Sequence, residues 1–105
     1  MKKKTDKVTA VIELKITPAK DTGIAKIAQR VAKFPQVDAC FLMSGAYDLL
    51  VFVSGNSLQE VAHFVSAELS TIDGVLSTAT HFMLNTYKAK GLLAEFADDN
   101  RLPVV

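Results

Sequence analysis

Residues 37–54 read VDACFLMSGAYDLLVFVS, two short runs rich in aromatic and β-branched residues that are separated by Gly45-Ala46. Such runs predict strands over 37–44 and 47–54. A two-residue loop with glycine first is typical of a type II′ turn, so the stretch predicts a β-hairpin. Tyr47 and the charged Asp48 lie at the start of the second strand, directly before the most apolar run in the chain.

The segments on both sides of this hairpin have clear periodicity. Alternating apolar residues predict strands before and after it, and apolar residues at helical spacing predict two helices. Asp21 or Thr22 is the expected N-cap of the first helix, and Ser57 with Glu60 forms a capping box for the second. The predicted elements are a strand over 8–16, a helix over 21–34, a helix over 57–69 and a strand over 75–87.

The resulting order is strand, helix, strand, strand, helix, strand, which is the split βαβ or ferredoxin-like pattern. The predicted fold is therefore α+β, with a four-stranded antiparallel sheet and both helices on one face. The other face stays bare within one chain although it carries apolar residues, so we expect a dimeric αβ arrangement at least. The expected organisation is a flexible tail over 1–7, one domain over 8–88 and a C-terminal extension over 89–105.

Composition restricts the class of protein. The chain has 105 residues, of which 50% are hydrophobic and 22% charged, with a formal net charge of +1. This size suits one globular domain, and the charge does not favour non-specific nucleic-acid binding. The lysines at 2–4 are not followed by an uninterrupted apolar segment, which excludes a signal peptide or a membrane helix there. A single cysteine, Cys40, allows no intrachain disulfide and suits a reducing cytoplasm.

The predicted topology brings several distant segments to one end of the sheet, which we call the rim. The first helix starts there, the hairpin turns, the second helix ends and the last strand begins. Asp48 at this rim has two interpretations: it caps nearby backbone amides, or it receives the ammonium group of a small ligand. In the second case backbone groups of the glycine turn would take the ligand carboxylate, and Thr78 and Thr80 would add hydroxyl groups.

Other chemistry has little support. His63, His81 and Cys40 lack the spacing of metal ligands, so no metal or cofactor is expected. No serine or threonine has an evident base beside it. An Asp48–His81 acid–base pair is conceivable, but His81 points to the opposite face from Thr80. The Ser54-Gly55-Asn56-Ser57 turn is better explained as a loop with a helix cap than as a phosphate site.

A combination of motifs in the second half of the chain resembles a known family. Gly45-Ala46-Tyr47-Asp48 precedes Leu49-Leu50-Val51, and a helix is followed by Asp73-Gly74-Val75 and Ser77-Thr78-Ala79-Thr80. This combination is similar to the effector-binding domain of the leucine-responsive/asparagine-type (Lrp/AsnC) regulators, also called the regulation-of-amino-acid-metabolism (RAM) domain. The similarity covers about residues 8–88.

The resemblance implies a ligand and an assembly. Domains of this kind dimerise through their sheets and associate further into an octamer or a similar ring. Small effectors, usually amino acids, bind between neighbouring dimers. The site carried over to this sequence comprises Gly45, Ala46, Tyr47, Asp48, Thr78 and Thr80. Ala67 stands where some amino-acid-binding members have an acidic residue, so a basic ligand side chain is not expected to be recognised in that way.

The resemblance also implies a role in transcription regulation or amino-acid metabolism. Only seven residues precede Val8, too few for the helix-turn-helix of roughly fifty residues that full regulators carry. We therefore expect a stand-alone, cytoplasmic effector-binding domain that is not an enzyme, that contacts neither DNA nor a membrane directly, and that binds an amino acid or co-assembles with a full-length regulator. The segment after Lys90 is expected to cap a neighbouring subunit.

Two alternatives remain open on the sequence. One is a small ferredoxin-like enzyme of the dimeric αβ-barrel kind, which would need an enclosed pocket lined by His63, His81 or Asp48. The other is an adaptor without a small ligand that joins a helix-turn-helix partner through its sheet.

Overall fold

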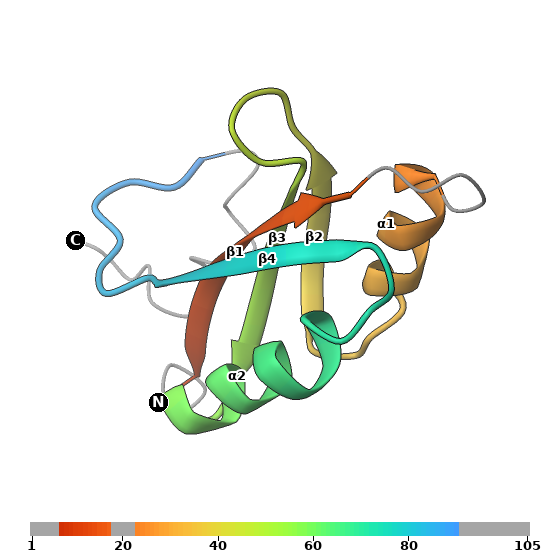
Figure 1. Ribbon diagram of the computed structural model, residues 1–105. Helices are drawn as coiled ribbons and strands as arrows, with labels where there is room; N and C mark the ends of the chain where they lie inside the picture. The colour runs from red at the N-terminus through yellow and green to blue at the C-terminus, as the bar shows by residue number, and fades with distance from the viewer. Residues whose placement is uncertain (1–6, 18–22, 91–105) are drawn as a thin grey trace.

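The computed structural model describes residues 7–17 and 23–90, and these form a ferredoxin-like βαββαβ domain, as predicted (Figure 1). Four antiparallel strands lie in the order β2-β3-β1-β4. Two helices complete the domain, and α2 continues directly into a π-helical turn, η2. The elements are β1 (Val8–Ile16), α1 (Ile24–Ala32), β2 (Val37–Leu42), β3 (Leu49–Gly55), α2 (Leu58–Phe64), η2 (Val65–Leu69) and β4 (Val75–Phe82).

The core lies between one face of the sheet and the two helices. Alternate residues of the central strands β1 and β3 point into it, and Leu14 and Val51 have no exposed surface. Both helices contribute to the same cluster, α1 through Ile27 and Val31. The buried residues of this cluster are aliphatic apart from Phe64. Because burial of a Leu, Ile or Val side chain contributes about 1.5–3 kcal/mol, this face supplies most of the stability of the fold.

No helix formed by the described residues lies over the opposite face of the sheet, which we call the open face. It carries the intervening positions of the same strands, and these are apolar or charged rather than uniformly polar. Phe41 and Phe52 pack edge to face on it, with their ring centroids 6.0 Å apart. Its residues include Val11, Glu13, Lys15, Phe41, Leu50, Phe52, Ala79 and His81. The described residues thus confirm a partly apolar face without a covering helix, although Phe52 on this face is only 6% exposed.

The first helix is shorter than predicted. It runs from Ile24 to Ala32 rather than over 21–34, and Gly23 occupies the N-cap position without a side-chain hydrogen bond. The expected cap residues, Asp21 and Thr22, lie outside the described residues. The C-terminal end is close to the prediction, because the amide of Phe34 still donates to the carbonyl of Val31 before Pro35 stops the helix.

The predicted hairpin is confirmed in its register but not in the length of its strands. Cross-strand partners such as Leu42 and Leu49 are those that a two-residue loop at 45–46 requires. Regular pairing stops there, however, so residues 43–48 form a six-residue connection closed by the Met43 amide donating to the Asp48 carbonyl (2.9 Å). Gly45 has a φ of 126°, a conformation that other residues adopt only with strain.

The capping box before α2 is present in a modified form. The Ser57 hydroxyl accepts from the Glu60 amide (3.0 Å), as predicted. The Glu60 carboxylate reaches one residue further back and accepts from the Asn56 amide (3.2 Å) instead of that of Ser57. The helix then widens into η2, where the Ser70 amide donates to the Val65 carbonyl (2.8 Å). A π turn of this kind accommodates one extra residue and changes which side chains face outward.

The turn into β4 depends on glycine. Gly74 has a φ of 100°, and a Cβ atom there would lie 2.6 Å from the Cδ1 atom of Ile27 on α1. The Gly74 carbonyl also accepts from the Thr17 amide (2.8 Å). This one position therefore joins the end of β1, the start of α1 and the start of β4.

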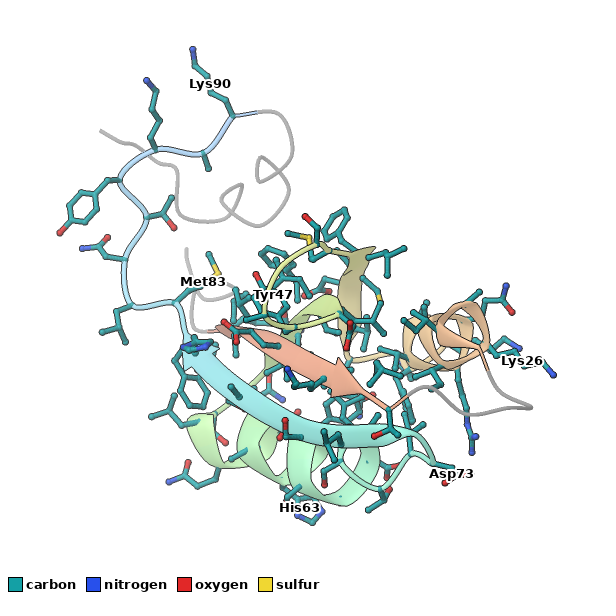
Figure 2. All side chains as sticks on the ribbon, turned by 45° about the horizontal axis from the view of Figure 1, so that its top comes forward. Lys26, Tyr47, His63, Asp73, Met83 and Lys90 are labelled. Carbon is teal, nitrogen blue, oxygen red and sulfur yellow. The ribbon has the colours of Figure 1, made fainter. Side chains whose placement is uncertain are left out.

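The last strand ends earlier than predicted, at Phe82 rather than at residue 87. Its last residue pairs with Ala10 of β1. Just beyond it, the Met83 amide donates to the Thr9 carbonyl, which is the last backbone hydrogen bond between the two segments. Residues 83–90 then run away from the sheet (Figure 1), and Lys90 lies far from both helices in Figure 2. Leu84 and Tyr87 on this segment are 92% and 93% exposed. Most of the predicted extension, 91–105, lies outside the described residues, as does the tail at 1–6.

Candidate functional site

The rim predicted from topology is present in the structure. The pairing of Leu14 with Leu49 and of Ile16 with Val75 puts the end of β1, the hairpin loop and the start of β4 at the same end of the sheet. The end of η2 lies close by, because Val75 donates its amide to the carbonyl of Ile72 (3.0 Å), just beyond η2. The hairpin loop extends beyond the sheet in Figure 1.

Asp48 holds the hairpin to the end of β1. Its Oδ2 atom accepts from the Ile16 amide (2.7 Å), and its own amide donates to the Leu14 carbonyl (2.9 Å). Ile16 is 7% exposed, so its amide would otherwise lack a partner in a poorly hydrated place. The side chain thus supplies the acceptor that regular pairing no longer provides where β3 begins. The Oδ2 atom of Asp48 therefore acts as a cap for a backbone amide, which was one of the two interpretations of the sequence. The amide that it caps, that of Ile16, is distant in sequence rather than nearby.

The other carboxylate oxygen of Asp48 remains available for a ligand. No further hydrogen bond to this half-buried side chain comes from a described residue, and a carboxylate accepts more than one. The ligand interpretation therefore stays a prediction alongside the observed cap.

The other hairpin residues of the predicted site surround Asp48. Gly45 and Ala46 are exposed, and Tyr47 is half-buried; Figure 2 shows Tyr47 on the hairpin loop. The Ala46 carbonyl accepts from the Lys15 Nζ atom (2.9 Å). Lys15 was not a predicted site residue, because alternation along β1 marked it only as an outward-facing polar side chain. The register between β1 and β3, which places Lys15 beside Asp48, is the signal that identifies it.

The two threonines of the predicted site lie elsewhere in the same chain. Thr78 is opposite Leu14 and Thr80 opposite Ile12, so both half-buried side chains share the helix-covered face. They belong to β4, whereas Asp48 precedes β3, and β1 runs between the two strands. Two strand spacings amount to about 10 Å. A single chain therefore brings the hairpin residues together but does not bring Thr78 and Thr80 into contact with them.

The histidines are not arranged for catalysis with Asp48. His81 is opposite Val11 and contacts Glu13 on the open face, with 3.2 Å between its Nε2 atom and the Glu13 Oε2 atom. This position is four residues along β1 from the level of Asp48, roughly 13 Å away. His63 is exposed on α2 and points away from the sheet in Figure 2. The expected orientation of His81, opposite to that of Thr80, is confirmed.

The remaining candidates are structurally ordinary. Cys40 is opposite Val51 on the helix-covered face, and burial raises the pKa of its thiol. Ala67 is exposed within η2. Within residues 7–17 and 23–90, no group of three His, Cys, Asp or Glu side chains is placed to hold a metal ion. The helices in the described part of the chain are too short or too polar to span a membrane.

Comparison with protein families gives a match over most of the chain. Residues 9–93 match the model of the Lrp/AsnC ligand binding domain. The uncharacterized HTH-type transcriptional regulator YugG of Bacillus subtilis is 48% identical over 98 residues, which are 93% of this chain and 59% of that protein. An uncharacterized HTH-type transcriptional regulator of Pyrococcus horikoshii is 32% identical over 81 residues, which are 77% of this chain and 49% of that protein. The chain thus spans about half the length of the curated relatives that it matches.

Solved structures agree with this family. A transcriptional regulator of Neisseria meningitidis, described as a complex with L-methionine, has a TM-score of 0.73 and 28% sequence identity, covering 85% of this chain and 58% of that one. AsnC of E. coli has a TM-score of 0.72 and 21% identity, covering 81% of this chain and 56% of that one. The second likeness supports the fold alone, and the first extends to the sequence.

Proposed function

Because this chain belongs to the Lrp/AsnC ligand binding domain family, we propose that it binds a small amino-acid effector at the rim and converts binding into a change of assembly. It would act in the regulation of transcription or of amino-acid metabolism, in the cytoplasm, without catalysing a reaction. The observation that carries this proposal is the hairpin at 43–48, which presents a partly available carboxylate on an exposed loop and is held in place by β1.

The open face is the proposed surface for a homodimer. It leaves Leu50 and Val11 half-buried in a single chain, and a second copy would remove them from water. Dimers of this kind would associate further into an octamer or a similar ring, which would bring hairpins and β4 strands of different subunits together. Thr78 and Thr80 of one subunit would then complete a site at Asp48 of another.

The kind of ligand is proposed from the relatives and from the rim. One solved regulator at 28% identity is described as an L-methionine complex. In this chain, Asp48 offers an acceptor for an ammonium group, and Ala67 offers no charge for a ligand side chain. An uncharged amino acid therefore suits the rim better than a basic one.

A partner that reads DNA is also part of the proposal. The curated relatives are named HTH-type transcriptional regulators, and this chain matches about half of their length. A full-length regulator of the same family could pair with it through the open face, and effector binding would then alter DNA occupancy through the mixed assembly rather than through direct contact by this chain.

The alternative of a small dimeric αβ-barrel enzyme has less support. Such an enzyme needs an enclosed polar pocket between sheet and helices, whereas the described residues of that layer include no buried polar or charged side chain. Its candidate residues also lie apart, with His63 on the outer side of α2 and His81 on the open face.

The proposal is tested by light scattering and thermal unfolding of the purified chain across the twenty amino acids. We expect at least one uncharged amino acid to raise the melting temperature and to change the mass of the assembly, because binding and assembly are thermodynamically linked. A mass and a melting temperature that stay constant for every amino acid would overturn the sensing function.

A further inference from the structure

Lys15 contacts the hairpin loop from the end of β1. It is the penultimate residue of β1, and the pairing of Leu14 with Leu49 places it next to Asp48 across the two strands. Its side chain is exposed, yet its ammonium group is not simply solvated, because it donates to the carbonyl of Ala46 in the hairpin loop (2.9 Å).

Three consecutive residues of β1 therefore hold the hairpin. The Leu14 carbonyl accepts from the Asp48 amide, the Lys15 ammonium donates to the Ala46 carbonyl, and the Ile16 amide donates to the Asp48 carboxylate. The first of these contacts joins two backbone groups, and the last joins a backbone amide to the Asp48 side chain. The contact of Lys15 uses a charged side chain, and its ammonium group has donors beyond the one that it gives to the loop carbonyl.

Lys15 and Asp48 carry opposite charges beside the same hairpin loop. No salt bridge joins the Lys15 and Asp48 side chains, and each instead bonds to a backbone group. An ammonium group has three donors, and a carboxylate has two oxygens. Each group therefore retains capacity for a further hydrogen-bond partner.

We propose that Lys15 binds the carboxylate of the effector while Asp48 binds its ammonium group, so that the rim selects a zwitterion. An α-amino acid carries these two charges on neighbouring atoms and would bridge the two side chains with charge-assisted hydrogen bonds. This inference rests on the proposed function, because it concerns the same site, and it assigns the carboxylate to a side chain rather than to backbone groups of the turn.

A purely structural role for Lys15 makes a different prediction. If Lys15 only fastens the loop, any donor of similar length would serve, and the charge on the ligand carboxylate would not matter. Lys15→Gln keeps a neutral donor and removes the charge. Lys15→Arg keeps the charge, and Lys15→Met removes both.

The experiment measures binding to the full chain by calorimetry for the twenty amino acids and for their carboxamides, which keep the ammonium group but lack the carboxylate. For the amino acid that binds wild type best, we expect Lys15→Gln and Lys15→Met to weaken binding at least about tenfold. Lys15→Arg should retain most of the affinity. The carboxamide should bind wild type weakly. Its affinity for Lys15→Gln should equal its affinity for wild type, because the carboxamide has no carboxylate for the Lys15 ammonium group to contact.

The outcomes separate the inference from the function on which it rests. The inference is wrong if an amino acid binds wild type and Lys15→Gln with the same affinity, or if the amino acid and its carboxamide lose affinity equally in every variant. In either case Lys15 only holds the hairpin loop in place, and the sensing function still stands. If no amino acid binds wild type, the proposed function itself fails, and the assignment of Lys15 fails with it.

Discussion

The two faces of the sheet are built from the same strands but are completed differently. On the helix-covered face, Leu14 and Val51 have no exposed surface. One residue along each strand, Lys15 is exposed and Leu50 is half-buried on the open face. The helix-covered face is fully packed within one chain, whereas the open face keeps apolar and charged groups at the surface. This difference indicates that folding depends on one face, and that assembly and ligand chemistry depend on the other face and on the rim.

The largest expected effect on stability comes from a change on the helix-covered face. Leu14→Ala removes a fully buried side chain between sheet and helices, and such changes cost about 2–5 kcal/mol of unfolding free energy. Chemical denaturation measures this loss. The matched change on the open face, Leu50→Ala, should cost less at low protein concentration, and its effect should grow with concentration because it acts through association. Equal losses that do not depend on concentration would remove the contrast between the faces.

The contact between Asp48 and Ile16 should have the next largest effect. Asp48→Ala leaves the nearly buried Ile16 amide without its acceptor, which should lower the unfolding free energy by about 1–3 kcal/mol. Asp48→Asn retains an acceptor oxygen and should lose less, which makes it the better variant for tests of ligand binding. If denaturation finds wild-type stability for Asp48→Ala, the carboxylate does not serve as the cap.

A charge on the open face should change assembly more than folding. Leu50→Glu would place a carboxylate in the centre of the proposed dimer surface, where burial of an unpaired charge is unfavourable. Sedimentation should show a fall to monomer mass while circular dichroism retains the spectrum of the folded chain. Gln29→Glu on the exposed side of α1 is the control and should leave the mass unchanged. A wild-type mass for Leu50→Glu would show that subunits do not meet through this face.

The smallest expected effect concerns Cys40 on the helix-covered face. Because burial raises the pKa of its thiol, the unfolded chain releases this proton at lower pH than the folded chain. Stability should therefore decline slightly as pH rises past the ordinary thiol pKa, and Cys40→Ala should lack that part of the decline. Alkylation by iodoacetamide should also be slower in the folded than in the unfolded chain, and equally slow in Leu50→Glu. Faster alkylation in Leu50→Glu would show that the two faces are not independent.

Much of the fold could be predicted from local patterns. Alternation and helical spacing identify β1, both helices and the hairpin, and the order of elements then determines the ferredoxin-like topology. The ends of the strands could not be predicted in this way, because they depend on partners distant in sequence. Strand β4 ends at Phe82, opposite Ala10, with one further backbone hydrogen bond from Met83 to Thr9, although the sequence remains compatible with a strand up to residue 87.

The candidate site shows the same division. Topology alone placed the hairpin and the start of β4 at one rim. The contacts of Asp48 with Ile16 and of Lys15 with Ala46 depend on the register between β1 and β3, which periodicity does not reveal. The separation of Thr78 from Asp48 follows from the strand order, since β1 lies between them.

The central claim is that the rim binds an amino acid where subunits meet, and a crystal structure tests it most directly. Crystals would be grown with the amino acid that raises the melting temperature most. The account predicts electron density for the ligand at a subunit contact, with its ammonium group at Asp48 and with Tyr47 beside it. Density enclosed between the sheet and the helices, or at a contact that leaves the hairpin at 43–48 empty, would contradict the account.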